Sequence, residues 1–564
     1  MKGFSISVVC CLLLTRAALA QGQAPVCHTQ EATKSATRPA VLFEGAGKVH
    51  LEITTRSAEA QAFFDQGLAL LHSFWGYEAD RSFTRAAQLD PECAMAQWGI
   101  AMADVNEIKR NEAIKRAKEL AANATDRERL YIVAVEARYD GERSSVQNNG
   151  FLGASDSYRG AMRKIVAAYP DDLEAKLFLA LAEMSGYERD GTPRAGTMEA
   201  IALCQVVLYR DPNHLAAHHY LIHALESGKR PQDAVPHADK YPSLAPSVGH
   251  AVHMPGHIYV HVDRWEDAAN AFERSAEVDR AYIRDQHETS DHAAGPYGHN
   301  VHFLTMVYGY QGRYRDALRV SRELVELGRD PKEAGSRAAL EGRLGMLRTL
   351  VRFEKWGEIL DGHTLADDGP FEVFAAWRYY ARALAHLGRN DSSAARAELA
   401  SLEREIAWMK DRLPKLTEAP QKGRQRQQLR ALAVGPLEIN ARLLAREGKA
   451  DEALKKVREG IEEEIKLGYS EPPLYPQPME EVAGKVSLEL KRWKEAEEFF
   501  RAAIERDPGS GRALFGLFEA LQGAGKSTEA RDVLDRFNRA WSKADSDLPE
   551  MRRARTLVAR GSGQ

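Results

Sequence analysis

The sequence has 564 residues, of which 28% are charged and 44% are hydrophobic, and its formal net charge is −4 at pH 7. A chain of this length exceeds the size at which one compact core stops growing, so it forms either several domains or one long repeat structure. The balanced charge and the lack of a basic stripe argue against nucleic-acid binding. After residue 20 no apolar run is long enough to span a membrane.

The N-terminus has the three parts of an export signal. Lys2 supplies a positive charge, residues 4–14 are apolar, and residues 18–20 (Ala-Leu-Ala) form a small-x-small cleavage site. We therefore expect residues 1–20 to be removed and the mature protein to be periplasmic or secreted. Residues 21–58 are rich in small and polar residues and are predicted to be a flexible lead-in.

From residue 60 onward, small and aromatic residues recur at the spacings of the tetratricopeptide repeat (TPR), a helix pair of about 34 residues. A frame that starts at Ala60 contains Gly67, Ala79, Phe83, Ala86 and Pro91 at the positions that the repeat favours. A frame that starts at Gln477 contains the corresponding Gly484, Ala496, Phe500, Ala503 and Pro508. The next frame begins at Gly511.

Three further frames begin in the middle of the chain, at Leu215, Gly249 and Gly298. Weaker helix pairs are predicted around residues 94–140, 157–185, 336–360, 371–410 and 428–463. The pattern predicts an all-α, right-handed superhelical solenoid of TPR-type helix pairs, in which stacked neighbours share one continuous core. We expect an N-terminal solenoid over 59–330, a C-terminal solenoid over 331–545 and a tail over 546–564.

Histidines are concentrated in the three middle frames. Of the 18 histidines, 13 lie between His214 and His302. In TPR proteins, positions 2, 5, 9 and 12–13 of the first helix face the concave groove. These positions hold His219, His223 and Glu226 in one frame, His250, His253, His257 and His261 in the next, and His299 and His302 in the third.

This pattern predicts a metal site in the groove. Residues four apart on a helix lie on one face, as His219/His223 and His253/His257 do, and His302 belongs to the adjacent repeat. The predicted ligands are therefore His219, His223, His253, His257 and His302, for an ion such as Zn, Cu, Fe or Ni. Additional ligands are predicted among Glu226, His250, His261, His287, His292 and His299. A break of the helix at Pro255 would weaken the pairing of His253 with His257.

Two other interpretations of the histidines remain open. An imidazole-lined groove also suits an acidic peptide or an organic anion without any metal, with contacts that depend on pH. Alternatively, the histidines are only packing elements of the repeat.

Four short segments are more specific than the generic repeat: residues 253–259 (HMPGHIY), 299–304 (HNVHFL), 470–473 (SEPP) and 506–515 (RDPGSGRALF). In these segments the chain resembles a family of bacterial TPR proteins without a characterised function, over about residues 60–540. It departs from that family at Gly298, where a proline is usual, and at Leu474, where a tryptophan is usual. The resemblance implies the fold and its extent and implies no activity.

Three functions follow as hypotheses. The first is an exported binding protein that holds a transition metal or a metal-dependent ligand, and the second is a metal-free scaffold for a protein or peptide in the concave groove. The third is a metal-dependent enzyme with Glu226, Glu288 or Asp291 as the base. The enzyme is the least favoured, because nothing in the sequence defines a substrate pocket.

Overall fold

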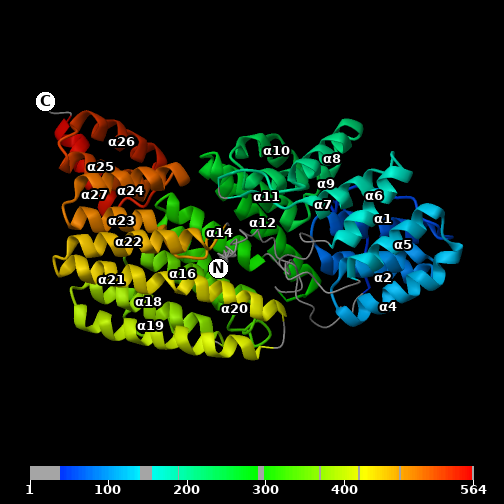
Figure 1. Cartoon of the computed structure of the whole chain (residues 1–564), viewed down its shortest axis with the longest axis horizontal. Helices are drawn as coiled ribbons and strands as arrows, with labels where there is room; N and C mark the ends of the chain where they lie inside the picture. Colours follow the sequence, from blue (N-terminus) through cyan, green and yellow to red (C-terminus); the bar gives the residue numbers. More distant parts are fainter. Residues whose placement is uncertain are drawn as a thin grey trace, which may run out of the picture.

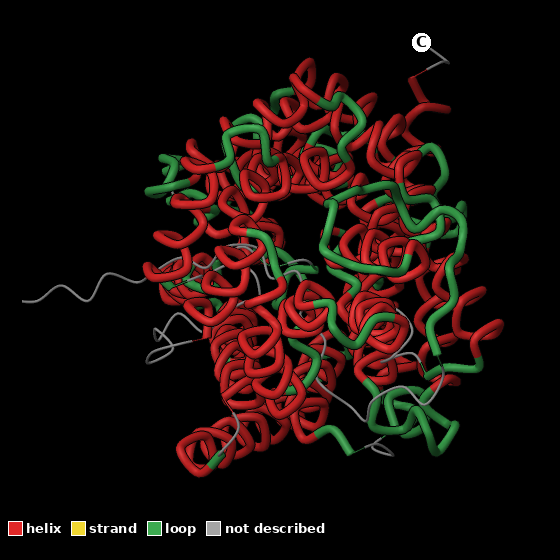
Figure 2. Tube along the Cα trace, turned by 90° about the vertical axis from the view of Figure 1, so that its right-hand side faces the viewer, coloured by secondary structure: helices red, strands yellow, loops and turns green. Residues whose placement is uncertain are grey.

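All the regular structure of the chain is helical. The computed structural model describes residues 39–139, 155–188, 190–289, 297–366, 370–416, 419–468, 470 and 472–561. Within these ranges the extended pairing is limited to one antiparallel bridge between Tyr187 and Pro193. No helix in this part of the chain combines the length and the apolar character needed to cross a membrane. Figure 2 shows helices joined by loops throughout, so the predicted all-α solenoid of TPR-type helix pairs is confirmed.

The helices of the N-terminal half follow one another as antiparallel pairs. Many begin at a side chain that accepts a hydrogen bond from the first turn, as Ser57 does from Ala60 and Asp172 does from Ala175. The helices are α1 (Ala58–His72), α2 (Gly76–Leu89), α3 (Ala94–Ala103), α4 (Glu107–Leu120), η1 (Ala121–Asn123), α5 (Asp126–Tyr139), α6 (Asp156–Ala168), α7 (Leu173–Glu183), α8 (Thr197–Arg210), α9 (Leu215–Glu226), η2 (Pro231–Ala234), α10 (Val235–Leu244), α11 (Gly249–His261), α12 (Trp265–Gln286), α14 (Tyr297–Tyr310) and α15 (Tyr314–Leu327).

The C-terminal half continues the same arrangement. In Figure 1 it lies on the left and the N-terminal half lies on the right, with α14 near the middle. Its helices are α16 (Arg337–Arg352), α17 (Trp356–Ile359), α18 (Glu372–Gly388), α19 (Ser392–Arg412), η3 (Leu413–Lys415), α20 (Ala419–Leu432), α21 (Val434–Arg446), α22 (Ala450–Ile465), α23 (Met479–Glu489), α24 (Trp493–Arg506), α25 (Gly511–Gly523), α26 (Ser527–Ala540) and α27 (Pro549–Gly561).

The signature positions of the repeat meet as the sequence predicts. Phe83 of α2 packs between Gly67 of α1 and Gly99 of α3, and a Cβ added at Gly67 would lie 2.8 Å from the Phe83 ring. A Cβ at Gly99 would lie closer still. Glycine at these positions lets the aromatic ring pack directly against the backbone of two neighbouring helices, which is how adjacent repeats share a core.

Replacing Gly99 with alanine is expected to destabilise the protein by about 1–3 kcal/mol, because the added methyl group overlaps the buried Phe83 ring. Urea denaturation measures this change. The matched control is Gly160→Ala in α6, where a Cβ meets nothing within 4 Å. There alanine is expected to stabilise the helix by about 0.5–1 kcal/mol. Equal effects at the two positions would contradict the packing assigned to Phe83.

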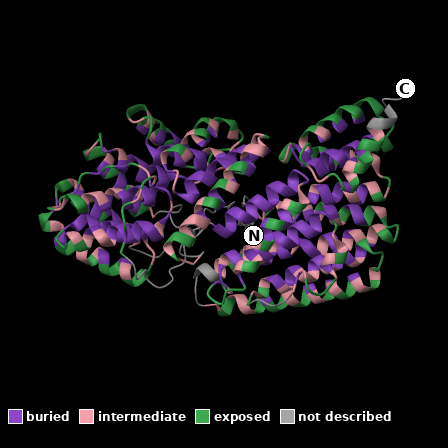
Figure 3. Cartoon of the chain, turned by 180° about the vertical axis from the view of Figure 1, so that it is seen from behind, coloured by how far each residue is buried: buried purple, intermediate pink, exposed green. Residues whose placement is uncertain are grey.

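Each half curls so that residues far apart in the chain touch. In the N-terminal half, the turn after α1 reaches α10 and α12: the Tyr241 hydroxyl donates to Ser73 Oγ at 3.2 Å, and the ring centroids of Trp75 and Tyr282 lie 4.8 Å apart. In the C-terminal half, Arg352 of α16 donates to the carboxylate of Glu481 in α23 at 3.1 Å. Figure 3 shows the buried residues concentrated where the helices meet.

The segment before α1 differs from the flexible lead-in predicted for residues 21–58. Val49, Leu51 and Ile53 are buried, and Thr54 donates from its amide and its hydroxyl to the Glu128 carboxylate, at 2.6 and 2.7 Å. The alternation of the three apolar residues lets an extended segment bury one side. This pattern was present in the sequence, but the composition of the surrounding segment obscured it.

The C-terminal end of the chain is more ordered than the tail predicted for residues 546–564. Residues 549–561, expected to belong to a tail, form α27, and Ala554 in it is buried. The predicted signal peptide, residues 1–20, and the remainder of the lead-in up to residue 38 lie outside the described residues.

Candidate metal centre

Six buried histidines lie together on the neighbouring helices α9, α11 and α14. They are His219 and His223 of α9, His250, His253 and His257 of α11, and His299 of α14, and none is more than 7% exposed. They occupy positions 2, 5 and 9 of their repeats. Helix α11 continues through Pro255, so its pair of histidines keeps the one-turn spacing.

The first cluster consists of His219, His223 and His250. Nε2 of His219 lies 3.0 Å from Nε2 of His223 and 3.0 Å from Nε2 of His250. One ligand atom from each of the three lies within 4.8 Å of the others. Two nitrogens bound at about 2.0–2.1 Å to one tetrahedral zinc ion are about 3.3 Å apart. Two of the three nitrogen–nitrogen distances are therefore close to the spacing that one shared ion requires.

Two polar contacts determine which nitrogens face one another. Nδ1 of His219 lies 2.6 Å from the carbonyl oxygen of His72, which can only accept, so this Nδ1 carries the proton. Nδ1 of His223 donates in the same way to the Glu226 carboxylate at 3.2 Å. In the neutral rings both Nε2 atoms then carry lone pairs, which repel each other at 3.0 Å unless a cation lies between them. Metal-binding histidines use this arrangement, with the second nitrogen donating to a carbonyl or a carboxylate.

The first cluster is covered by Phe74, in the turn between α1 and α2. The centroid of the Phe74 ring lies 4.5 Å from that of His219, 5.4 Å from that of His223 and 5.6 Å from that of His250. Phe74 has a left-handed backbone conformation with φ of 56°, which is uncommon for a bulky residue and is held by the surrounding contacts. The sequence predicts that these imidazoles face an open groove. In the structure they are instead buried beneath the turn between α1 and α2.

The second cluster consists of His253, His257 and His299. Nε2 of His253 lies 3.0 Å from Nε2 of His257, and one ligand atom from each of the three lies within 4.8 Å of the others. Nδ1 of His253 is buried and has no hydrogen-bond partner among the described residues. The ring of His253 is also 5.1 Å from that of His250, so the two clusters adjoin.

Burial keeps most of these imidazoles neutral. Burial, followed by repulsion from neighbouring imidazoles, lowers the pKa of His219, His250, His253 and His257 well below 6.5. Burial and the Arg337 charge lower the pKa of His299 to about 3. Neutral imidazole is the form that binds transition metals.

His302, one of the five predicted ligands, lies apart from both clusters. Its Nδ1 is bonded to the Glu341 carboxylate, and its Nε2 accepts from Nε of Arg348 at 3.4 Å. Both ring nitrogens are therefore engaged by α16. The repeat position of His302 matches that of His219 and His253, but the neighbouring helix supplies polar partners in place of further imidazoles.

The remaining predicted residues have different roles. His250 and His299, expected as additional ligands, complete the two clusters, and Glu226 orients His223. His261 ends α11 and belongs to neither cluster, and His287 follows α12 and is exposed. Glu288 accepts a hydrogen bond from the Tyr77 hydroxyl at 2.9 Å. His292 and Asp291 lie outside the described residues.

A buried carboxylate that the sequence did not single out, Glu174 of α7, supports the first cluster. It lies 2.6 Å from Nε2 of His72 and 3.0 Å from Nε2 of His214. Burial alone would raise the pKa of Glu174, but the two imidazoles lower it to about 2. Because the carbonyl of His72 accepts from His219, the hydrogen bond between Glu174 and His72 also holds one side of the cluster in place.

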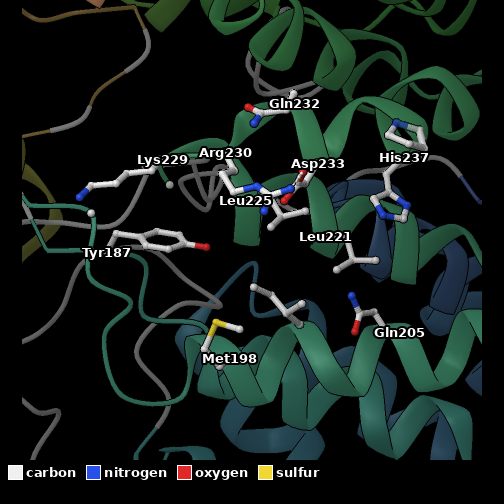
Figure 4. A pocket seen from close by; sticks show the side chains of 14 residues that line it. Tyr187, Met198, Gln205, Leu221, Leu225, Lys229, Arg230, Gln232, Asp233 and His237 are labelled. Atoms are coloured by element: carbon white, nitrogen blue, oxygen red, sulfur yellow. Dashed lines mark hydrogen bonds and ion pairs between the residues drawn. The ribbon is translucent and has the colours of Figure 1, made fainter.

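A pocket of about 700 Å³ lies beside α8 and α9 and is separate from the histidine clusters (Figure 4). Leu221 and Leu225 of α9 line it, together with Met198 of α8 and Lys229. Two residues along a helix correspond to a rotation of about 200°. Leu221 therefore lies on the face of α9 opposite His219, and the pocket and the clusters do not share a surface of this helix.

Residues 472–478 pack against helices α16 and α21 of the C-terminal half. Arg348 of α16 donates to the carbonyl oxygens of Pro473, Tyr475 and Pro476, the last two at 3.0 and 2.9 Å. The fully buried Glu438 of α21 accepts from the Tyr475 hydroxyl at 2.6 Å and from Gln477 at 2.8 Å. This segment includes part of the SEPP motif, so the motif contributes to tertiary structure.

A family model supports the TPR assignment for one part of the chain. A tetratricopeptide-repeat family model matches residues 487–556, and no curated protein matches the chain. The APC/C hetero-tetramer Cut9–Hcn1 is 10% identical with a TM-score of 0.29, covering 89% of this chain and 78% of that chain. Yeast Tom70 is 11% identical with a TM-score of 0.24, covering 90% of each chain. Rap protein, complexed with competence and sporulation factor, is 12% identical with a TM-score of 0.35, covering 66% of this chain and 98% of that chain.

Proposed function

We propose that this chain is an exported TPR protein that binds a transition-metal ion through His219, His223 and His250 and presents its solenoid to a protein partner. The observation that carries the proposal is that Nε2 of His219 lies 3.0 Å from Nε2 of His223 and from Nε2 of His250, while Nδ1 of His219 and of His223 donates elsewhere. Imidazole ligands suit Zn, Cu, Fe and Ni. The predicted signal peptide of residues 1–20 supports export. The extended surface that stacked repeats provide supports binding of a protein partner.

Burial argues against the alternative in which the histidines attract an acidic ligand as pH changes. A histidine attracts an anion only when it is protonated. His219 and His250 are fully or almost fully buried, and burial lowers the pKa of both well below 6.5. They therefore stay neutral over the range in which exposed histidines gain charge.

The catalytic alternative has less support than metal binding. A general base must reach a substrate, but Glu226 is buried against His223, and the pocket in Figure 4 opens on the other face of α9. The metal is therefore proposed to serve binding or assembly.

The test is the metal content of the untagged mature protein, residues 21–564, before and after titration with Zn(II). Metal content should fall by one ion per chain in the double variant His219→Leu/His223→Leu. Leucine is the matched substitution, because the corresponding residues of α7 are the buried Leu177 and Leu181. The control is His302→Gln, which removes a buried imidazole outside both clusters and should leave metal content unchanged.

Stability provides a second measurement of the same binding. A free metal-ion concentration of 100 times the dissociation constant is expected to raise the free energy of unfolding by about 2.7 kcal/mol, since only the folded chain holds the three side chains together. If the wild type takes up no ion above background, or if the double variant binds as much as the wild type, the proposed function is wrong.

A further inference from the structure

We propose that His253, His257 and His299 form a second transition-metal site beside the first, so that the protein holds two ions in a centre of six imidazoles. This inference rests on the proposed function and extends it to the neighbouring repeat. The three ligand atoms lie within 4.8 Å of one another, and the two Nε2 atoms of α11 are 3.0 Å apart.

Repeat equivalence is the main argument for the second site. In the first site, positions 5 and 9 of α9 hold His219 and His223, and position 2 of the next first helix holds His250. One repeat further along, positions 5 and 9 of α11 hold His253 and His257, and position 2 of α14 holds His299. Because stacked repeats place equivalent residues in equivalent surroundings, the second cluster is the first moved along the solenoid by one repeat.

The neighbouring repeats show that these positions need not hold histidine. In α7 the corresponding residues are Leu177 and Leu181, both buried, so leucine fills the same space in the packed solenoid. In α14, position 5 is His302 and position 9 is Met306, and His302 is bonded to Glu341 and Arg348. Paired histidines therefore occur in α9 and α11, where the next first helix supplies a third imidazole. They do not recur in α14, where the next first helix, α16, supplies no imidazole.

The two sites are close enough for their ions to interact. The rings of His250, in the first site, and His253, in the second, have centroids 5.1 Å apart. Allowing for a metal–nitrogen bond of about 2.0–2.1 Å at each ring, the two ions would lie within about 11 Å of each other. All six ligands are imidazoles, which favours transition metals over Ca²⁺ and Mg²⁺.

The experiment is a titration of the metal-free mature protein with Cu(II), followed by electron paramagnetic resonance. The wild type is expected to bind two ions per chain, and the variants His253→Leu/His257→Leu and His219→Leu/His223→Leu are each expected to bind one. The spectrum of the loaded wild type should be broadened by the neighbouring ion, and either double variant should show the narrower signal of an isolated ion.

Retention of the first ion by His253→Leu/His257→Leu also shows that this variant is folded. If it does not fold, His299→Leu replaces one ligand on another helix and should likewise bind one ion. The inference is overturned if the wild type binds one ion and the His253→Leu/His257→Leu variant still binds it, a result that leaves the proposed function intact. Two bound ions without spectral broadening would contradict the adjacency of the sites. Failure of the wild type to bind any ion overturns the proposed function as well.

Discussion

Replacing Glu174 with glutamine is expected to lower the free energy of unfolding by about 3–5 kcal/mol, the range for breaking one partner of a buried ion pair. The carboxylate contacts His72 and His214, and all three side chains are almost completely buried. A neutral amide leaves the His214 imidazolium without a counter-charge and replaces the carboxylate that His72 contacts. Urea denaturation near pH 6 measures the loss, and metal affinity should fall with it because His72 holds His219.

The control for this prediction is Glu199→Gln in α8. The Glu199 side chain is 42% exposed and pairs with Arg163, so its replacement is expected to change stability by less than about 0.5 kcal/mol. If Glu174→Gln has an effect as small as this control, then the buried ion pair does not stabilise the fold.

The pH dependence of the same variant follows from two pKa shifts. The pKa of Glu174 is about 2 in the folded chain, below its ordinary 4.5, so its contribution is complete above pH 4.5 and is lost as pH falls toward 2. Burial would lower the pKa of His214, but Glu174 raises it above 6.5. The contribution of His214 is therefore complete below pH 6.5 and is lost at higher pH. The stability difference between wild type and variant should be largest between about pH 4.5 and 6.5.

Replacing Glu438 with alanine is expected to lower the free energy of unfolding by about 3–5 kcal/mol and to release residues 472–478 from helices α16 and α21. Glu438 is fully buried and accepts from the hydroxyls of Tyr380 and Tyr475, at 2.8 and 2.6 Å, and from Arg442 at 2.9 Å. Its loss leaves a largely buried guanidinium and two hydroxyls without their acceptor. Denaturation measures the cost, and faster amide hydrogen exchange at Tyr475 and Gln477 reports the release of the segment.

A graded control separates this network from general destabilisation. Tyr475→Phe removes one hydrogen bond and keeps the ring, so it is expected to cost about 1 kcal/mol. Similar losses in the two variants, or unchanged exchange in Glu438→Ala, would contradict the role assigned to Glu438.

Local spacing was sufficient to predict the repeat architecture. Helices α9, α11 and α25 begin at Leu215, Gly249 and Gly511, where the predicted frames begin. Phe83 meets Gly67 as those frames require. The packed segment before α1 was missed, because its three alternating apolar residues lie in a stretch whose overall composition resembles a linker.

The candidate site was predictable in part. The pairing of His219 with His223 and of His253 with His257 follows from one-turn spacing. His302 was predicted to join these pairs because it occupies the same repeat position as His219 and His253. Its surroundings differ from theirs, because Glu341 and Arg348 of α16 bind both of its ring nitrogens. Glu174 and Phe74 left no signal at short range, because Glu174 is 102 residues from His72 and 40 from His214, and Phe74 is more than four repeats from the histidines that it covers.

The sequence by itself determined the helix pairs, the order in which they stack and the face on which the histidines lie, because those properties depend on residues within one repeat or its neighbour. Tertiary structure decided that this face is buried, that six imidazoles divide into two groups of three, and that His72 and Phe74 lie against the first group. The burial of the first group and its contacts with His72 and Phe74 depend on the curvature of the solenoid, which brings the turn after α1 onto α9 and α11. Curvature is the sum of small rotations between many packed helices, and no single stretch of sequence specifies it.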